Sequence, residues 1–346
     1  MISGYYLYLR IMKRFFFSRT VRCTAAVVVL LLVVTGMGLW TVRPLDADAV
    51  RRNVSLVVVR SWYELDCDGH AVAYFRDVQG DSLLAGPTLE RDSAVTVTAV
   101  AGCWVNEYLA LPSCRGRLVT VTACLPDTLR SGADNLVAHT RKALTHRIAD
   151  MTLEQSELKY YVRVHGVQDN GYHEIAALTD RHARLLDSDI RTLAVLDSIS
   201  SKKYILRRHV TYTAYVRNAN GKVQTVKCCL TATDTTTSAV LLRTASGKTP
   251  ENVSSVGILP WSADDTATVV VPSYGGVGER IASDSTMRCV LVGGHLDADK
   301  HDIPAVLVVD GSPVYTLRGH FSGLISGRQV VSRDVVRRLI EKGGDR

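Results

Sequence analysis

Several common signatures of metal and nucleotide chemistry are missing from this sequence. No two cysteines stand in a CxxC arrangement and no two histidines in an HExxH arrangement, so zinc ribbons, thioredoxin-like centres and zinc peptidases of that type are not indicated. The glycine-rich stretch Tyr274–Glu279 lacks the lysine and the serine or threonine of a phosphate-binding loop, and we interpret it as a turn. No cofactor is therefore implied.

The cysteines do not form the pattern of a disulfide scaffold. Of the eight, Cys23 borders a long apolar segment and the other seven follow it. An odd number, in a chain long enough to bury a large core, makes disulfides unnecessary for stability. We interpret most of them as small buried residues and leave any pairing open.

Acidic residues are absent before residue 24, whereas five cations stand there: Arg10, Lys13, Arg14, Arg19 and Arg22. These five account for most of the net charge of +7 and leave +2 for the remainder, so nucleic-acid binding is not indicated. The 47% hydrophobic composition also argues against disorder.

The segment Thr24–Val42 holds nineteen residues without a charge, close to the length needed to cross a bilayer as a helix. The preceding cations predict a single-pass protein of the inner (cell) membrane, with residues 1–23 in the cytoplasm and the C-terminal domain periplasmic or otherwise extracytoplasmic. A cleaved signal peptide is the alternative, because Gly36–Gly38 is a weak cleavage site.

After a polar linker at 43–53, short segments rich in valine, threonine and aromatic residues predict strands, and the period then changes. Apolar residues recur at helical spacing from Asp134 to about Gly166 and again from Asn170 to Ser200, which predicts a helical hairpin. Strand character returns from His209 onward, and Ser332 can cap a final helix over 333–341. The expected domains are a first barrel (54–133), a helical insertion (134–203), a second barrel (204–331) and a C-terminal helix and tail (332–346).

Four local strings carry a resemblance to a known family. They are Ala101–Asn106 with Leu109–Leu111, Glu157–Tyr161 with Val164–Tyr172, Ser238–Leu242, and Gly319–Leu324 with Ser326–Val331. In this order they resemble the strand pair that delivers the catalytic histidine, the helical insertion, the strand after the catalytic aspartate, and the Gly-x-Ser-Gly-Gly-Pro nucleophile loop of the membrane-anchored trypsin-like serine peptidases of Bacteroidetes-type bacteria. The resemblance implies a mainly β, chymotrypsin-like double β-barrel with an inserted helical hairpin, preceded by one transmembrane helix.

The triad positions that the resemblance implies are replaced. Carried across residue by residue, the histidine falls on Cys114, or on Ser113 if the turn is one residue shorter, and neither is an imidazole base. The carboxylate falls on Thr237, with Asp234 three residues early.

The nucleophile falls on Phe321, although a slip of one residue would present Ser322 with Gly323 behind it. The chain therefore resembles a degenerate member, without peptidase activity.

Two further interpretations stay open. One is an active serine endopeptidase that uses Ser322 with His320 or His295 as its base, and the other is an exported β-rich structural or assembly component. A degenerate cleft can still bind an extended polypeptide by strand addition, which makes a binding or scaffold role the first expectation. The sequence does not indicate an oligomeric state.

The loop 293–302 carries the residues of a possible metal site: His295, Asp297, Asp299 and His301. Glycine and aspartate are also ordinary turn residues, and we interpret this stretch as a hairpin loop after a strand. The histidines near the helical insertion show no ligand spacing either.

Overall fold

The structure is a computed structural model, and it describes residues 24, 26–32, 45–80, 83–106, 115–122, 128–129, 133–199, 204–218, 220–258, 267–274 and 289–343. In this part of the chain, no helix combines the length and the apolar character needed to cross a bilayer. Of the predicted span at 24–42, only residues 24 and 26–32 are described, and they are helical. The membrane anchor stays a prediction.

Six strands close the first barrel. In chain order they are β1 (Val54–Cys67), β5 (Thr96–Asn106), β6 (Arg117–Val121), β8 (Tyr204–Arg217), β9 (Val223–Asp234) and β10 (Ala239–Thr244). Their pairing runs β1-β5-β6-β10-β9-β8 and returns to β1. If the six strands are numbered 1 to 6 in chain order, their order around the barrel is 1-2-3-6-5-4.

Six further strands close the second barrel. They are β12 (Thr268–Ser273), β13 (Val290–Asp297), β14 (Lys300–His301), β15 (Pro313–Thr316), β16 (Phe321–Ser326) and β17 (Gln329–Ser332). Their order is β12-β13-β14-β17-β16-β15, which is again 1-2-3-6-5-4. Two six-stranded barrels of one topology are the chymotrypsin-like fold that the resemblance implied.

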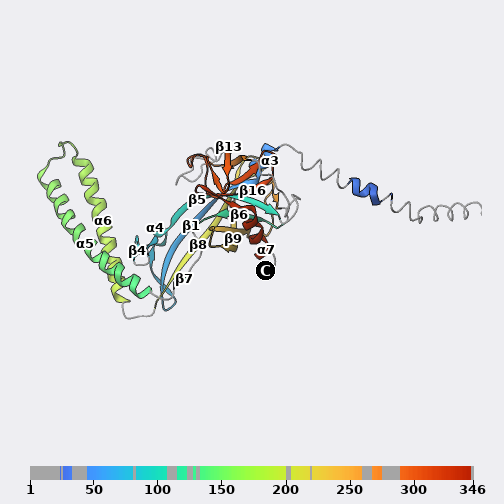
Figure 1. Ribbon diagram of the computed structural model, residues 1–346. Helices are drawn as coiled ribbons and strands as arrows, with labels where there is room; N and C mark the ends of the chain where they lie inside the picture. Colours follow the sequence, from blue (N-terminus) through green and yellow to red (C-terminus); the bar gives the residue numbers. More distant parts are fainter. Residues whose placement is uncertain are drawn as a thin grey trace, which may run out of the picture.

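Helices α5 (Ala133–Val164) and α6 (Tyr172–Ser198) form the predicted hairpin, which stands clear of both barrels (Figure 1). It is carried by the first barrel, whose strands β1 and β8 continue beyond the ring. There β1 leaves β5 and pairs with β2 (His70–Phe75) instead. We call this projection, made of the ends of β1 and β8 with β2 and the two helices, the arm.

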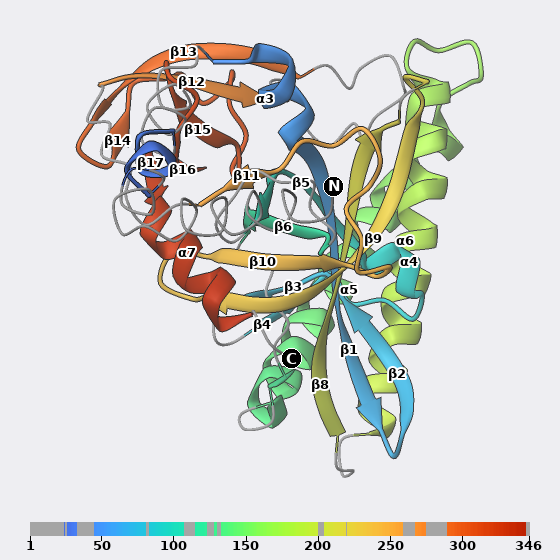
Figure 2. The same ribbon diagram turned by 90° about the vertical axis from the view of Figure 1, so that its right-hand side faces the viewer.

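Smaller elements complete the fold. They are α3 (Ala47–Asn53), β3 (Asp77–Gln79), β4 (Leu83–Ala85), α4 (Arg91–Ala94), β7 (Thr128–Leu129), β11 (Val256–Gly257) and α7 (Arg333–Lys342). Ser332 takes the predicted N-cap position of α7, although its side chain makes no capping bond. Helix α7 lies across strands β9 and β10 (Figure 2).

The expected division into domains needs two corrections. The sequence interpretation gave residues 204–331 to the second barrel, but β8, β9 and β10 close the first barrel on the far side of the hairpin. The insertion therefore interrupts the first barrel and does not separate the two. The residues 43–53, expected to be a linker, include helix α3, because the Asp46 carboxylate accepts bonds from the backbone N–H groups of Asp48 and Ala49 and starts a helix there.

One apolar core crosses from the first barrel to the second. It joins residues of β5, β6 and β10 to β15, β16 and the inner face of α7, among them Val119, Leu241, Tyr315, Leu324 and Leu339. Burial of large side chains at this boundary holds the barrels together as one body.

Candidate functional site between the barrels

The loop before β15 connects the second barrel to the first. The backbone N–H of Ala101 in β5 donates to the carbonyl of Asp310 at 2.7 Å. The next residue, Gly311, has a φ of +83°, and a Cβ there would overlap the carbonyl of Ala101 and the hydroxyl of Thr120. Only glycine allows this close approach of two backbones.

Asn53 organises a buried polar contact at the same boundary. Its side-chain amide donates to the carbonyls of Trp104 at 2.7 Å and Ser254 at 3.0 Å. Its Oδ1 accepts from the Cys103 thiol and from the Tyr315 hydroxyl, which belongs to the second barrel. Burial raises the pKa of Cys103 to about 12, and burial also raises the pKa of Tyr315, so both groups stay protonated and donate.

The structure puts Thr237 in the tight turn between β9 and β10, next to the end of β6, where Ala239 pairs with Val121. Its hydroxyl donates to the Asp234 carboxylate at 3.1 Å. The backbone N–H of Thr236 donates to the other oxygen of Asp234. The two alternatives for the carboxylate position therefore bond to each other within one turn.

Cys114 and Ser113, the candidates for the histidine position, lie outside the described residues. Their described neighbour Gly116 accepts a bond from the backbone N–H of Thr244, at the end of β10 opposite to Thr237. A base beside Thr237 would have to follow β6. The sequence has no histidine between His70 and His139, so no residue of the β5–β6 pair or its continuation supplies an imidazole.

Phe321 and Ser322, the candidates for the nucleophile, lie inside strand β16. Phe321 is buried in the shared core, where its ring packs edge to face on that of Tyr315. Ser322 is the extra residue of a β-bulge, because Val314 pairs with Gly323 while Tyr315 pairs with Phe321. The next residue is Gly323, where a Cβ would overlap the Val331 carbonyl of β17. The close approach of β17 therefore explains this glycine, without a nucleophile loop.

His320 and Ser322 lie next to and within strand β16, whereas Thr237 lies in the β9–β10 turn. Gly323, next to Ser322, pairs with Ser332 at the start of α7. Thr237 lines a cavity together with residues 335–342 of that helix. The described residues therefore place both sets of sequence candidates along α7, with Ser322 at its start and Thr237 beside the cavity.

The loop that contacts the first barrel fits the nucleophile motif better than residues 319–324. Aligned on Gly311 and Pro313, the Gly-x-Ser-Gly-Gly-Pro pattern puts Asp310 at the nucleophile position. The Asp310 carboxylate accepts a bond from the backbone N–H of Gly327 at 2.7 Å. The neighbouring Ser312 is buried and bonds to Ser273, so it is not a substitute nucleophile. A search for a glycine and a proline two residues apart would have found this loop.

The proposed metal ligands His295, Asp297, Asp299 and His301 occupy the hairpin of β13 and β14. The ring of His301 bonds to the carbonyl of Gly327 at 2.9 Å, whereas His295 lies on the neighbouring strand β13, next to Leu296, the residue that pairs with His301. Among the described residues, no three histidine, cysteine or acidic side chains are close enough together to hold a metal ion.

Comparison with known proteins adds little to this geometry. No family model and no curated protein matches the chain. Of 118 matching chains of solved structures, one is described as "Crystal structure of Deg5". It has a TM-score of 0.31 and 10% identity over 81% of this chain and 85% of that chain. At this level of likeness the assignment rests on strand order, and the chain has a trypsin-like peptidase fold.

Proposed function

We propose that this chain is a membrane-anchored binding or scaffold module that keeps a trypsin-like peptidase fold without peptidase activity. Its ligand would be an extended polypeptide, which adds as a strand where the two barrels meet. Residues 24–42 would hold the chain in the inner membrane, with both barrels on the extracytoplasmic side.

The observation that carries the proposal is the set of residues at the boundary between the barrels. Hydrolysis by a triad needs a hydroxyl, an imidazole and a carboxylate in contact. Asp310 stands where the hydroxyl is needed, Thr237 where the carboxylate is needed, and the sequence has no histidine between the end of β6 and His139. Losing all three groups leaves no proton acceptor for a nucleophile, even if backbone donors remain.

A fluorophosphonate probe tests the absence of a reactive serine. We expect the full-length chain to remain unlabelled under conditions in which trypsin is labelled completely. Ser322→Ala serves as the matched variant, because Ser322 is the alternative nucleophile. Labelling of the wild-type chain that disappears in Ser322→Ala would establish the rival function, an active serine endopeptidase.

A further inference from the structure

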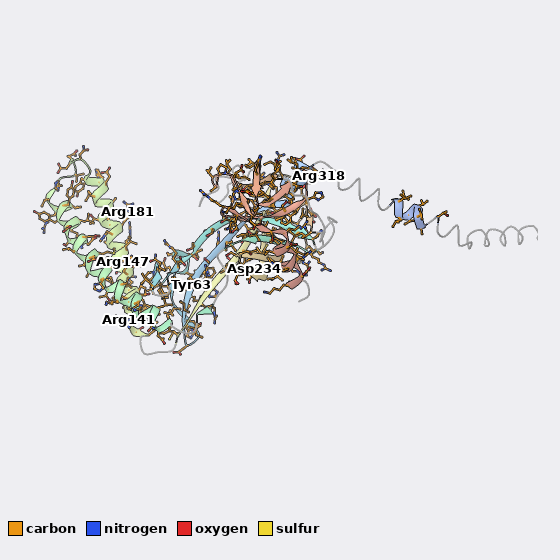
Figure 3. All side chains as sticks on the ribbon, in the orientation of Figure 1. Tyr63, Arg141, Arg147, Arg181, Asp234 and Arg318 are labelled. Atoms are coloured by element: carbon orange, nitrogen blue, oxygen red, sulfur yellow. The ribbon has the colours of Figure 1, made fainter. Side chains whose placement is uncertain are left out.

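A cavity of about 340 Å³ lies between helix α7 and the end of β9 with the turn that follows it. Its lining residues are Thr233, Asp234, Thr236, Thr237, Val335, Arg338, Leu339 and Lys342. Figure 3 labels Asp234 on the barrel body, well away from the arm. The volume is in the range of pockets for small ligands or for one or two residues of a peptide.

The cavity carries two cations on one side. Arg338 and Lys342 are four residues apart and share a face of α7. The acidic residues of the helix pair elsewhere, since Asp334 and Glu341 both contact Arg337. In the described part of the chain, the Arg338 guanidinium has no hydrogen bond or ion pair, and it can hold an oxyanion through two parallel bonds.

The opposite wall bears hydroxyl groups and one acid. The Asp234 carboxylate accepts bonds from Thr236 and Thr237, and lone pairs remain on it. These can accept an N–H group of a ligand. A second full negative charge, as in a phosphate dianion, would be repelled by Asp234 more strongly than a single carboxylate.

The floor of the cavity is apolar. Val335 and Leu339 line it and also belong to the shared core, so their positions are fixed.

A ligand that matches all three walls has one carboxylate, an adjacent N–H donor and an aliphatic group. We propose that this cavity binds the C-terminal residue of a polypeptide that ends in an aliphatic side chain. The proposal does not depend on whether the boundary between the barrels binds a second segment.

Titration calorimetry of the full-length chain tests this, with the tripeptide acetyl-Ala-Ala-Leu as the probe. We expect the free acid to bind and the C-terminal amide to bind at least about 10-fold more weakly, because the amide lacks the charge that Arg338 pairs with. Arg338→Gln should weaken binding of the free acid by a similar factor. Arg338→Lys should weaken it less, since lysine keeps the charge but cannot form the two parallel bonds.

Arg337→Gln is the matched control, because it removes the same charge from the same helix outside the cavity. Its affinity should equal that of the wild-type chain. Equal binding of acid and amide, equal effects at residues 337 and 338, or no binding of the acid would overturn the proposal. Binding of inorganic phosphate in place of the tripeptide would overturn the assignment to a chain end.

Discussion

The boundary between the barrels and the seam between the helices of the arm are both built with buried polar groups, but in different ways. At the boundary, Asn53 is 1% exposed and its amide satisfies groups of both barrels inside a continuous apolar core. In the arm, the apolar cluster reaches to Ile148 and Leu193, and the buried residues beyond them are polar: Gln155, Thr179 and Asp189.

The distal seam depends on ion pairs and single hydrogen bonds. Arg147 contacts the buried Asp189 at 2.8 Å, and the His182 ring bonds to Gln155 at 2.9 Å and to Glu154 at 3.0 Å. Figure 3 labels Arg147 along this hairpin, clear of the barrels. Desolvation cancels much of the gain of such pairs. The barrels therefore share one apolar core, whereas we expect the outer hairpin to tolerate changes at small cost in stability.

Gly311→Ala should produce the largest effect, because the new Cβ would force the loop away from Ala101 at a φ of +83°. We expect a loss of about 3 kcal/mol or more in the free energy of unfolding. Gly171→Ala is the control, since its φ is +84° but nothing lies within 4 Å of the new Cβ. It should cost about 1 kcal/mol, and equal losses in thermal unfolding would contradict the tight contact between the barrels.

Asn53→Ala should rank second. It leaves the Tyr315 hydroxyl and the Trp104 carbonyl buried without their partner, which costs about 1–3 kcal/mol for such groups. Tyr315→Phe removes one hydroxyl only and should cost less. Denaturant unfolding of both variants measures this order, and the reverse order would show that Asn53 is not the organising residue.

Asp189→Asn should have a small effect in the arm. Burial raises the pKa of Asp189, and Arg147 offsets this only in part. The contribution of this group is therefore fully present below its unfolded value of 3.8 and decreases as the pH rises through the folded pKa. Because the Arg147 side chain is 47% exposed and stays solvated without its partner, the variant should change stability at neutral pH by less than about 1 kcal/mol and weaken this pH dependence.

Hydrogen exchange of the α5 and α6 amides, compared between the variant and the wild-type chain at pH 4 and pH 7, measures the effect in the hairpin alone. A loss of protection at pH 7 as large as that caused by Asn53→Ala in the barrels would remove the contrast between the two interfaces.

Alkylation of the thiols in the wild-type chain should disturb the structure less than any of these substitutions. Burial raises the pKa of both Cys103 and Cys228 to about 12, whereas Cys229 is exposed. With iodoacetamide at pH 8, peptide mass spectrometry should find Cys229 modified while Cys103 and Cys228 are spared. Early modification of Cys103 would mean that the boundary between the barrels opens.

The helices were predictable because their signal is local. Apolar spacing predicted a helix from Asp134 to about Gly166, and the structure has one at Ala133–Val164. The strand expected at Ser238–Leu242 is β10. The barrel to which each strand belongs was not predictable. Nothing in the sequence of β8 indicates that it pairs with β1, some 140 residues earlier. Strand β16 was not predicted, because its glycine and serines suggested a loop. Asp310 was not predicted as a site residue, because the nucleophile motif had been aligned on residues 319–324 instead.

The central claim, that the peptidase fold has lost its chemistry, is tested most directly by incubating the full-length chain with a peptide library and sequencing what is bound and what is cut. We predict that bound peptides are recovered intact and that their yield is unchanged by Ser322→Ala. Cleavage products that accumulate with time and vanish in Ser322→Ala would contradict the account.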